Sequence, residues 1–231
     1  METSPLIEAC KSGDLEAIKA SLKEGSDINA VSVTGSTPLI YAAQNNQIEA
    51  VKLLLEKGAE VNIKNKIGGT ALNRAAETGN LEMMNLLFKH NAEIGPLALI
   101  IAAREGQLEA VKLLLEKGAD INAVQHWGQT ALMFAAREGH VEVVKYLISQ
   151  GADVKCKDKN GYTALNYAVE NEHSDLAIIL RSAGATESRA KKKEEAARKL
   201  EEDDDDDDNN SDDDIDLGSD DDVHDSTGED D

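Results

Sequence analysis

The chain has 231 residues and a formal net charge of −21, because 45 acidic residues stand against only 24 basic ones. A charge of this sign repels phosphate, so direct nucleic-acid binding is not expected. The two cysteines cannot build a disulfide framework, and no apolar run approaches the length of a membrane span. These features predict a soluble monomer of a reducing compartment, the cytosol or the nucleus, without a secretory signal.

The charge is unevenly distributed along the chain. Residues 1–186 carry 23 acidic and 18 basic residues, whereas residues 200–231 carry 19 acidic residues and no basic one. The segment between them, 187–199, has a net charge of +3. We therefore expect a folded domain and a chemically different C-terminal region to share one polypeptide.

A repeated pattern fills the first 185 residues. The segment Glu49–Ala59 recurs without change as Glu109–Ala119. Equivalent opening positions lie 33 residues apart, except for one interval of 27, and they are Ser4, Thr37, Thr70, Leu97, Thr130 and Thr163. This self-similarity predicts a domain over 1–185 with six stacked units, at about 1–33, 34–66, 67–93, 94–126, 127–159 and 160–185.

Each unit is predicted to form two short helices joined by a tight turn. Most opening positions supply a Ser or Thr hydroxyl as an N-cap, and a Pro or Ala follows it. Small and apolar residues then recur at helical spacing, as at Leu39, Ala42 and Ala43. A Gly or Asn, which accepts a left-handed conformation, ends the second helix of every unit. A turn-like stretch then leads into the next unit.

This order of helix, turn, helix and extended finger, with Thr37-Pro38-Leu39 and paired alanines in the first helix, resembles the ankyrin repeat. The resemblance implies an all-α solenoid in which β-turn fingers lie at one edge and the first helices line a concave face. The third unit lacks six residues after Glu93, so we expect a shortened finger there. Leu97 replaces the capping Thr of the fourth unit, which predicts an irregular junction, and Glu172 stands where the first turn usually has Gly.

The sequence offers no catalytic or metal-binding constellation. Its five histidines are scattered, and His140 occupies a site where ankyrin repeats often have a structural His. Cys10 aligns with inward alanines of other units, which indicates a buried core residue. Cys156 falls on a finger with no base evident beside it in sequence. We therefore expect no enzyme activity, no metal and no cofactor.

A protein partner is the expected ligand, because ankyrin proteins usually hold partners with finger tips and exposed positions of the first helices. The finger-tip candidates are residues 31–36, 64–69, 125–129 and 155–162. Trp, Tyr and Arg most often dominate interface energetics, and here they gather in units four to six. The candidate partner-binding residues are Trp127, Arg104, Arg137, Phe134, Tyr162 and Tyr167, with Tyr41 and Arg74 in earlier units. The family position of Phe134, Tyr167 and Tyr41 is often a partly packed Leu, so these three could instead belong to the core.

The C-terminal region has a different composition. Residues 186–202 are rich in helix formers and predict a charged helical extension, whereas residues 203–231 cannot bury a core and predict a disordered acidic tail. That tail could solubilise the chain, attract basic proteins, or fold back on the basic segment or on the groove. Ser211 and Ser219 each precede three aspartates and resemble acceptor sites of casein kinase 2.

Two functions remain open from the sequence. The first is a non-catalytic scaffold or adaptor that binds a partner protein through the concave groove and the finger tips, with the tail tuning the encounter. The alternative is a chaperone or escort of a highly basic client, of the histone or ribosomal-protein type, in which the groove and the acidic tail act together.

Overall fold

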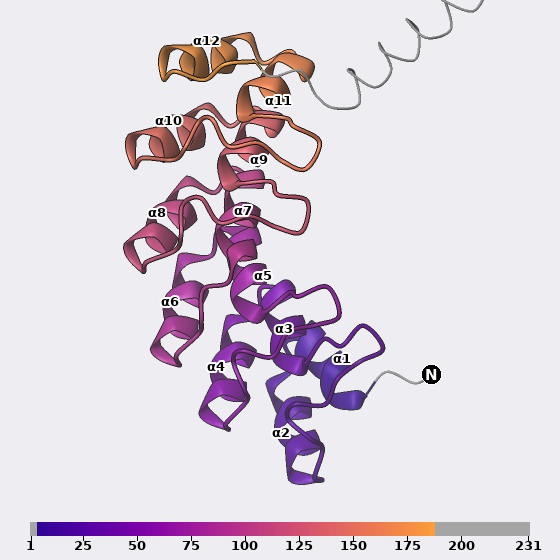
Figure 1. The fold of residues 1–231 in the computed structure, drawn as a ribbon. Coiled ribbons are helices and arrows are strands. Elements are labelled where there is room, and N and C mark those ends of the chain that lie inside the picture. Colours follow the sequence, from indigo (N-terminus) through magenta and orange to yellow (C-terminus); the bar gives the residue numbers. More distant parts are fainter. Residues whose placement is uncertain (1–3, 188–231) are drawn as a thin grey trace, which may run out of the picture. The chain divides into compact units, whose positions relative to one another are not determined.

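The computed structural model describes residues 4–187, which form six consecutive pairs of short helices (Figure 1). Each unit contributes a first helix and a second helix, and the first helices of successive units pack directly on one another. In chain order the helices are α1 (Pro5–Ser12), α2 (Leu15–Lys23), α3 (Pro38–Gln44), α4 (Ile48–Glu56), α5 (Ala71–Thr78), α6 (Leu81–Lys89), α7 (Pro96–Arg104), α8 (Leu108–Glu116), α9 (Ala131–Glu138), α10 (Val141–Ser149), α11 (Ala164–Glu170) and α12 (Ser174–Ser182). The predicted all-α stack is confirmed.

Strand pairing is minimal. Within residues 4–187 it amounts to one isolated bridge between Val124 and Thr130. None of the helices in that range combines the length and the apolar character needed to cross a membrane. The expected helical extension and acidic tail, including Ser211 and Ser219, lie outside the described residues apart from Thr186 and Glu187.

Threonine side chains start four of the first helices. Thr37, Thr70, Thr130 and Thr163 each accept a hydrogen bond from the backbone N–H of the third helical residue, at 3.2 to 3.3 Å. Each such bond satisfies a donor that the helix itself leaves unpaired, and it stabilises the fold by roughly 1 kcal/mol. The predicted capping role of these residues is therefore confirmed.

The fourth unit begins differently. In the register of the repeat Leu97 occupies the capping position, yet α7 already starts at Pro96, with Gly95 as its N-cap and no side-chain cap. Proline suits this place because its fixed φ matches a helix and its missing N–H would have been unpaired there anyway. The irregular junction predicted at Leu97 is confirmed. It arises because the shortened third unit runs directly into the helix.

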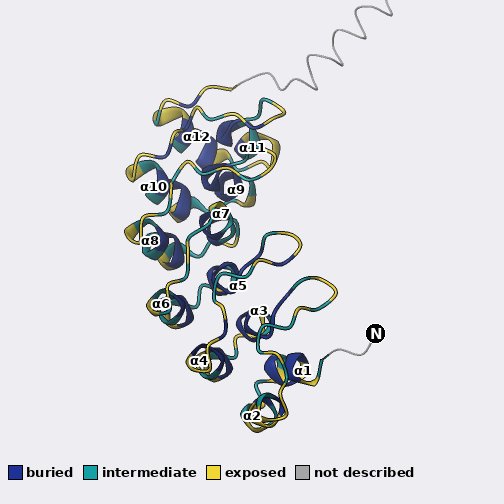
Figure 2. Cartoon of the chain, turned by 60° about the horizontal axis from the view of Figure 1, so that its bottom comes forward, coloured by how far each residue is buried: buried dark blue, intermediate teal, exposed yellow. Residues whose placement is uncertain are grey.

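Small side chains allow the first helices to stack closely. The paired alanines of the inner helices are 0% exposed, namely Ala42, Ala43, Ala75, Ala76, Ala102, Ala103, Ala135 and Ala136. Figure 2 shows the buried positions gathered where the helices face one another. Cys10 takes the equivalent place in α1, also at 0% exposure, and burial raises the pKa of its thiol to about 12. Cys10 is thus a core residue, as its alignment with the alanines predicts.

A polar side chain ties each unit to the preceding one at the turn between its two helices. The tying residues and their acceptors are Gln47 with the Lys11 carbonyl, Asn80 with the Asn46 side chain, Gln107 with the Glu77 carbonyl, His140 with the Arg104 carbonyl, and His173 with the Arg137 carbonyl. Glycine leaves the necessary room, since a Cβ at Gly106 would lie 2.6 Å from Nδ1 of His140. The structural role predicted for His140 is confirmed.

Extended fingers project from one edge of the stack, between each unit and the next (Figure 1). We call residues 27–36 finger 1, 60–69 finger 2, 93–95 finger 3, 120–129 finger 4 and 153–162 finger 5. The tips of neighbouring long fingers share one backbone hydrogen bond of 3.0 Å, from Lys66 N–H to the Thr34 carbonyl and from Lys159 N–H to the Trp127 carbonyl. An asparagine at the base adds a second contact, where Asn29 Oδ1 accepts from Glu60 N–H and Asn122 Oδ1 from Asp153 N–H, both at 2.9 Å.

Finger 3 is short, as the missing six residues predict. Its base is still held, because Asn62 Oδ1 accepts from Glu93 N–H at 2.9 Å. The chain then enters α7 at once, so finger 3 supplies no tip between fingers 2 and 4 (Figure 1). In the described part of the chain, the third and fourth units therefore share helix packing and the Gln107 contact but no hydrogen bond between fingers.

We predict that Glu172→Gly stabilises the domain by roughly 1 kcal/mol, because Glu172 holds a φ of +62° that costs a non-glycine residue about 1–2 kcal/mol. Lys57→Gly is the matched control, since Lys57 is also exposed at a helix end but has a φ of −90°. That variant should lose stability. The free energy of unfolding in urea measures both, and a Glu172→Gly variant no more stable than the parent chain would contradict the interpretation.

Candidate functional site

Three arginines lie on the first helices α5, α7 and α9, with Arg74 in the middle of its helix and the other two in the last turns. We call Arg74, Arg104 and Arg137 the arginine strip. Each belongs to an ion pair. Arg74 Nη1 lies 2.8 Å from Glu77 Oε2, and Arg104 Nε lies 2.7 Å from Glu105 Oε1. The second oxygen of Glu77 lies 3.9 Å from Arg104 Nη2, so Glu77 joins α5 to α7. Arg137 Nη2 lies 2.8 Å from Glu138 Oε1.

The strip is therefore close to neutral, with three arginines facing three glutamates. Exposed ion pairs of this kind add little stability, about 0–1 kcal/mol each. A ligand in contact with the strip would meet alternating charges rather than a uniform field.

Phe134 is a correction to the sequence-based list of contact residues. Its side chain is only 9% exposed, and the guanidinium of Arg137 lies 4.6 Å from the centre of its ring. Phe134 therefore packs under Arg137 and holds it by a cation–π contact. Arg74 is also less available than its place in the sequence indicates, since its side chain is 20% exposed and its guanidinium is engaged by Glu77.

The tyrosines fasten the fingers to the first helices. On α3, the Tyr41 hydroxyl lies 3.1 Å from Ser32 Oγ of finger 1, and hydrogen bonds with Ser32 and Thr34 lower the pKa of Tyr41. On α11, the Tyr167 hydroxyl donates to Asp158 Oδ2 of finger 5 at 2.7 Å and accepts from Gln129 Nε2 of finger 4. Burial, followed by the bond to Asp158, raises the pKa of Tyr167 to about 12.

Tyr162 completes this cluster. Its ring lies 5.4 Å from that of Tyr167, and its hydroxyl donates to Glu170 Oε1 at 2.8 Å. That bond is the main reason why the pKa of Tyr162 is raised. Side-chain contacts thus hold finger 4 and finger 5 to α11, a role for the tyrosines that the sequence analysis missed. The signal available in sequence was the hydrogen-bonding residues at the finger bases, Gln129 and Asp158.

Trp127 stands at the tip of finger 4 and is 57% exposed. The His126 ring meets it edge-on, with centroids 5.4 Å apart, and Lys159 Nζ lies 5.9 Å from the centre of its ring. Its carbonyl is held by Lys159 N–H, and Gln129 at the base of the same finger is held by Tyr167. Trp127 is therefore an exposed aromatic side chain on a fastened loop, as the finger-tip prediction requires.

Other exposed apolar residues accompany Trp127. Most of the large apolar side chains that are well exposed within residues 4–187 lie on the fingers, at Val31, Val33, Ile67, Val124 and Trp127. The sequence analysis placed Val31, Val33 and Ile67 within finger-tip candidates but gave them no weight beside Trp127 and the other aromatics. Val124 fell outside its finger-tip ranges.

Reactive groups are few in the described part of the chain. Residues 4–187 contain no group of three or more His, Cys, Asp or Glu side chains placed to hold a metal ion. Cys156 Sγ lies 3.5 Å from Asp153 Oδ2, and partial burial together with that carboxylate raises the pKa of its thiol. A raised pKa keeps the thiol protonated and weakly nucleophilic at neutral pH.

We predict that Tyr167 makes the domain sensitive to alkali. Its pKa is raised from 10.0 to about 12 in the folded state, so its contribution to the free energy of unfolding is complete below pH 10. That contribution falls as the pH rises from about 10 to about 12, because the unfolded chain then loses the proton first. Urea unfolding across this range should show a flatter pH dependence for Tyr167→Phe. Tyr41→Phe is the control and should not flatten it, because the Tyr41 pKa is shifted the other way.

Comparisons with known proteins agree with this architecture. A family profile described as ankyrin repeats in three copies matches residues 6–98 and again residues 99–191. The human ASB11 ankyrin repeat domain is 28% identical, with a TM-score of 0.71 over 81% of this chain and 86% of that one. An ankyrin repeat domain from Acinetobacter baumannii AYE is 33% identical, with a TM-score of 0.67 over 80% of this chain and 100% of that one. The search of curated protein sequences returned no match.

The repeat register, the helix pairs, the fingers and the profile match over most of the sequence all lead to one assignment. The two ranges that the family profile matches meet inside α7, next to the shortened finger 3. The chain belongs to the ankyrin-repeat family.

Proposed function

We propose that this protein is a binding scaffold or adaptor that recognises a partner protein through Trp127 and the arginine strip. Ankyrin repeats are generally protein–protein interaction modules, so a protein partner is the natural ligand class. The observation that carries the proposal is Trp127, a large aromatic side chain left 57% exposed on a loop that is hydrogen-bonded at both its tip and its base.

Rigid presentation is what makes Trp127 valuable to an interface. Exposure of a tryptophan ring to water is unfavourable, and a partner that buries the ring would remove a large apolar area from water. The contacts of Gln129 with Tyr167, and of Lys159 with the Trp127 carbonyl, order the loop before binding. A partner therefore loses less free energy to ordering than it would on a mobile loop.

The arginine strip would then provide specificity around this anchor. Arg104 and Arg137 are about one-third exposed, and both already point their guanidinium groups at glutamates. A partner carboxylate can join such a pair without desolvating an isolated charge. Phe134 supports Arg137 from below and would act through it.

The alternative function, escort of a highly basic client, depends on residues outside the described range. Residues 200–231 carry 19 acidic residues and no basic one, a charge that attracts basic proteins over long range. The arginine strip adds no net negative charge to that attraction. The tail would accordingly supply most of the affinity for a basic client, and the groove would supply little.

We predict that Trp127→Ala weakens partner binding by roughly 1–2 kcal/mol or more, a fivefold to thirtyfold loss of affinity, as expected for an interface hot spot. The proteins that an immobilised chain retains from extract can be quantified by mass spectrometry. Ile178→Ala is the matched control, because Ile178 is 61% exposed but lies on the second helix of the last unit. If thermal melting falls and retention does not, Trp127 is part of the scaffold rather than of the binding site.

We predict that removal of residues 188–231 separates the two functions. A scaffold should keep its partner after the deletion and when salt rises from about 0.1 M to about 0.5 M, because apolar contacts are little screened. An escort of a basic client should lose that client under both changes. Retention of basic proteins that depends on the tail and on low salt would therefore favour the escort function.

A further inference from the structure

Shortening of finger 3 leaves an open notch in the row of fingers. A cavity of about 490 Å³ lies there, between finger 2 and finger 4. We call it the finger notch, and its lining includes Ile67 from finger 2, Ile94 and Leu97 from the shortened junction, and Val124 and His126 from finger 4. The volume is within the range of about 300–1,000 Å³ that is typical of ligand sites.

The two walls of the notch carry backbone groups that lack the partners found elsewhere in the row. In the 33-residue register Ile67 corresponds to Thr34, whose carbonyl accepts from the next finger, and His126 corresponds to Lys159, whose N–H donates to the preceding finger. Across the notch neither the Ile67 carbonyl nor the His126 N–H forms a hydrogen bond within residues 4–187. An inserted backbone would meet an acceptor on one wall and a donor on the other, as in strand addition.

Large apolar side chains make up part of the lining of the notch. Ile67 is 76% exposed, more than any other large apolar side chain in the described range, and Val124 opposite it is 50% exposed. Ile94, Pro96 and Leu97 line the cavity beneath them. An occupant with apolar side chains would remove all of these surfaces from water, which is favourable in proportion to the area buried.

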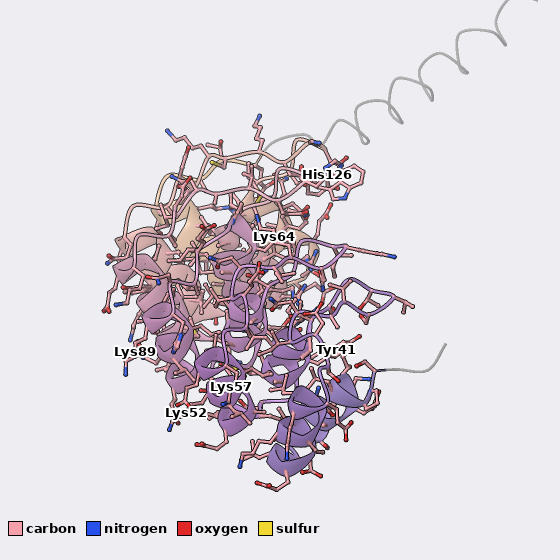
Figure 3. All side chains as sticks on the ribbon, turned by 90° about the horizontal axis from the view of Figure 1, so that it is seen from below. Tyr41, Lys52, Lys57, Lys64, Lys89 and His126 are labelled. Carbon is pink, nitrogen blue, oxygen red and sulfur yellow. The ribbon has the colours of Figure 1, made fainter. Side chains whose placement is uncertain are left out.

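The charge of the residues that line the notch indicates which kind of segment would bind there. Lys64 lines the cavity. Within residues 4–187 it has no carboxylate within 4.0 Å, in contrast to the paired arginines of the strip. Glu93 is the one acidic residue of the lining. Figure 3 labels Lys64 and His126 on the finger side of the domain, away from Lys52, Lys57 and Lys89 on the second-helix side.

We propose that the finger notch binds an extended segment of a partner protein, in which apolar residues alternate with acidic ones. The segment takes the place of the missing finger tip. Its apolar side chains pack on Ile67, Leu97 and Val124, its backbone pairs with Ile67 and His126, and its carboxylates meet Lys64. This site goes beyond the binding surface around Trp127, which is not part of the lining.

The test uses the full chain and a fluorescent eight-residue peptide in which Ile, Val and Leu alternate with Asp and Glu. Fluorescence anisotropy should show saturable binding, and a peptide with Lys at the acidic positions should bind at least about tenfold more weakly. Lys64→Glu should weaken binding of the acidic peptide by about tenfold or more. Lys52→Glu has the same charge change on the opposite side, so it should stay within about twofold of the parent chain.

A variant with a restored third finger tests directly whether the peptide binds in the notch. Replacing residues 94–97 by a copy of residues 61–70 returns the third unit to the 33-residue period and fills the notch with the chain's own backbone. The variant should keep its helical circular dichroism and lose peptide binding. Trp127→Ala should retain peptide binding, so failure of this proposal and failure of the proposed function are distinguishable.

Four results would overturn the proposal. The finger-restored variant could bind the peptide as well as the parent chain, or Lys64→Glu and Lys52→Glu could weaken binding equally, which would indicate non-specific attraction. A concentration-dependent dimer that the restored finger abolishes would assign the notch to a second copy of the chain. Peptide binding that is seen only after residues 188–231 are removed would assign it to the chain's own acidic tail.

Discussion

Close packing of small side chains between successive first helices is the constraint on which the rest of the domain depends. A single pair of helices cannot bury its apolar face, so each unit relies on its neighbours for a core. The alanine pairs of α3, α5, α7 and α9 bring these helices together and are completely buried. That approach in turn places the turn of one unit beside the next, where Gln47, Gln107, His140 and His173 reach the preceding backbone. The finger row follows the same spacing, which is why one missing tip opens a cavity.

The residues available for binding are those that are not already engaged in packing or hydrogen bonding within the domain. Tyr41 and Tyr167 resemble contact residues in the sequence, but they are occupied in holding fingers to helices. Trp127 is left on the outside by the same network. The large net charge of the chain gives little guidance to this surface, because the domain itself is only slightly acidic and the arginine strip is internally balanced. The finger notch differs from it, because Lys64 in its lining has no carboxylate within 4.0 Å in the described range.

The period of the sequence predicted most of the fold. Six units, the threonine caps, the buried Cys10, the structural His140 and the shortened finger 3 could all be read from residues in register, because each depends on local conformation or on repeated spacing. The exact start of α7 at Pro96 could not, since the loss of six residues changes which residue enters the helix first. The sequence left open whether Phe134 is a contact or a core residue, and the structure shows that it is buried. Pairing of the arginines was not predictable, because their partners are neighbouring side chains whose rotamers a pattern does not specify. The partner-binding role of Trp127 and the arginines stays a prediction.

The seam between the third and fourth units also concerns how the domain unfolds. In a linear array, stability is the sum of unit terms and nearest-neighbour terms, and cooperativity passes along the chain only as far as the interfaces are strong. This seam keeps its helix packing, the Gln107 contact and the Glu77–Arg104 ion pair, but it lacks the two finger hydrogen bonds that join fingers 1 and 2 and fingers 4 and 5, each worth about 0.5–1.5 kcal/mol. Shortening one finger therefore lowers the nearest-neighbour term at this seam as well as opening a cavity.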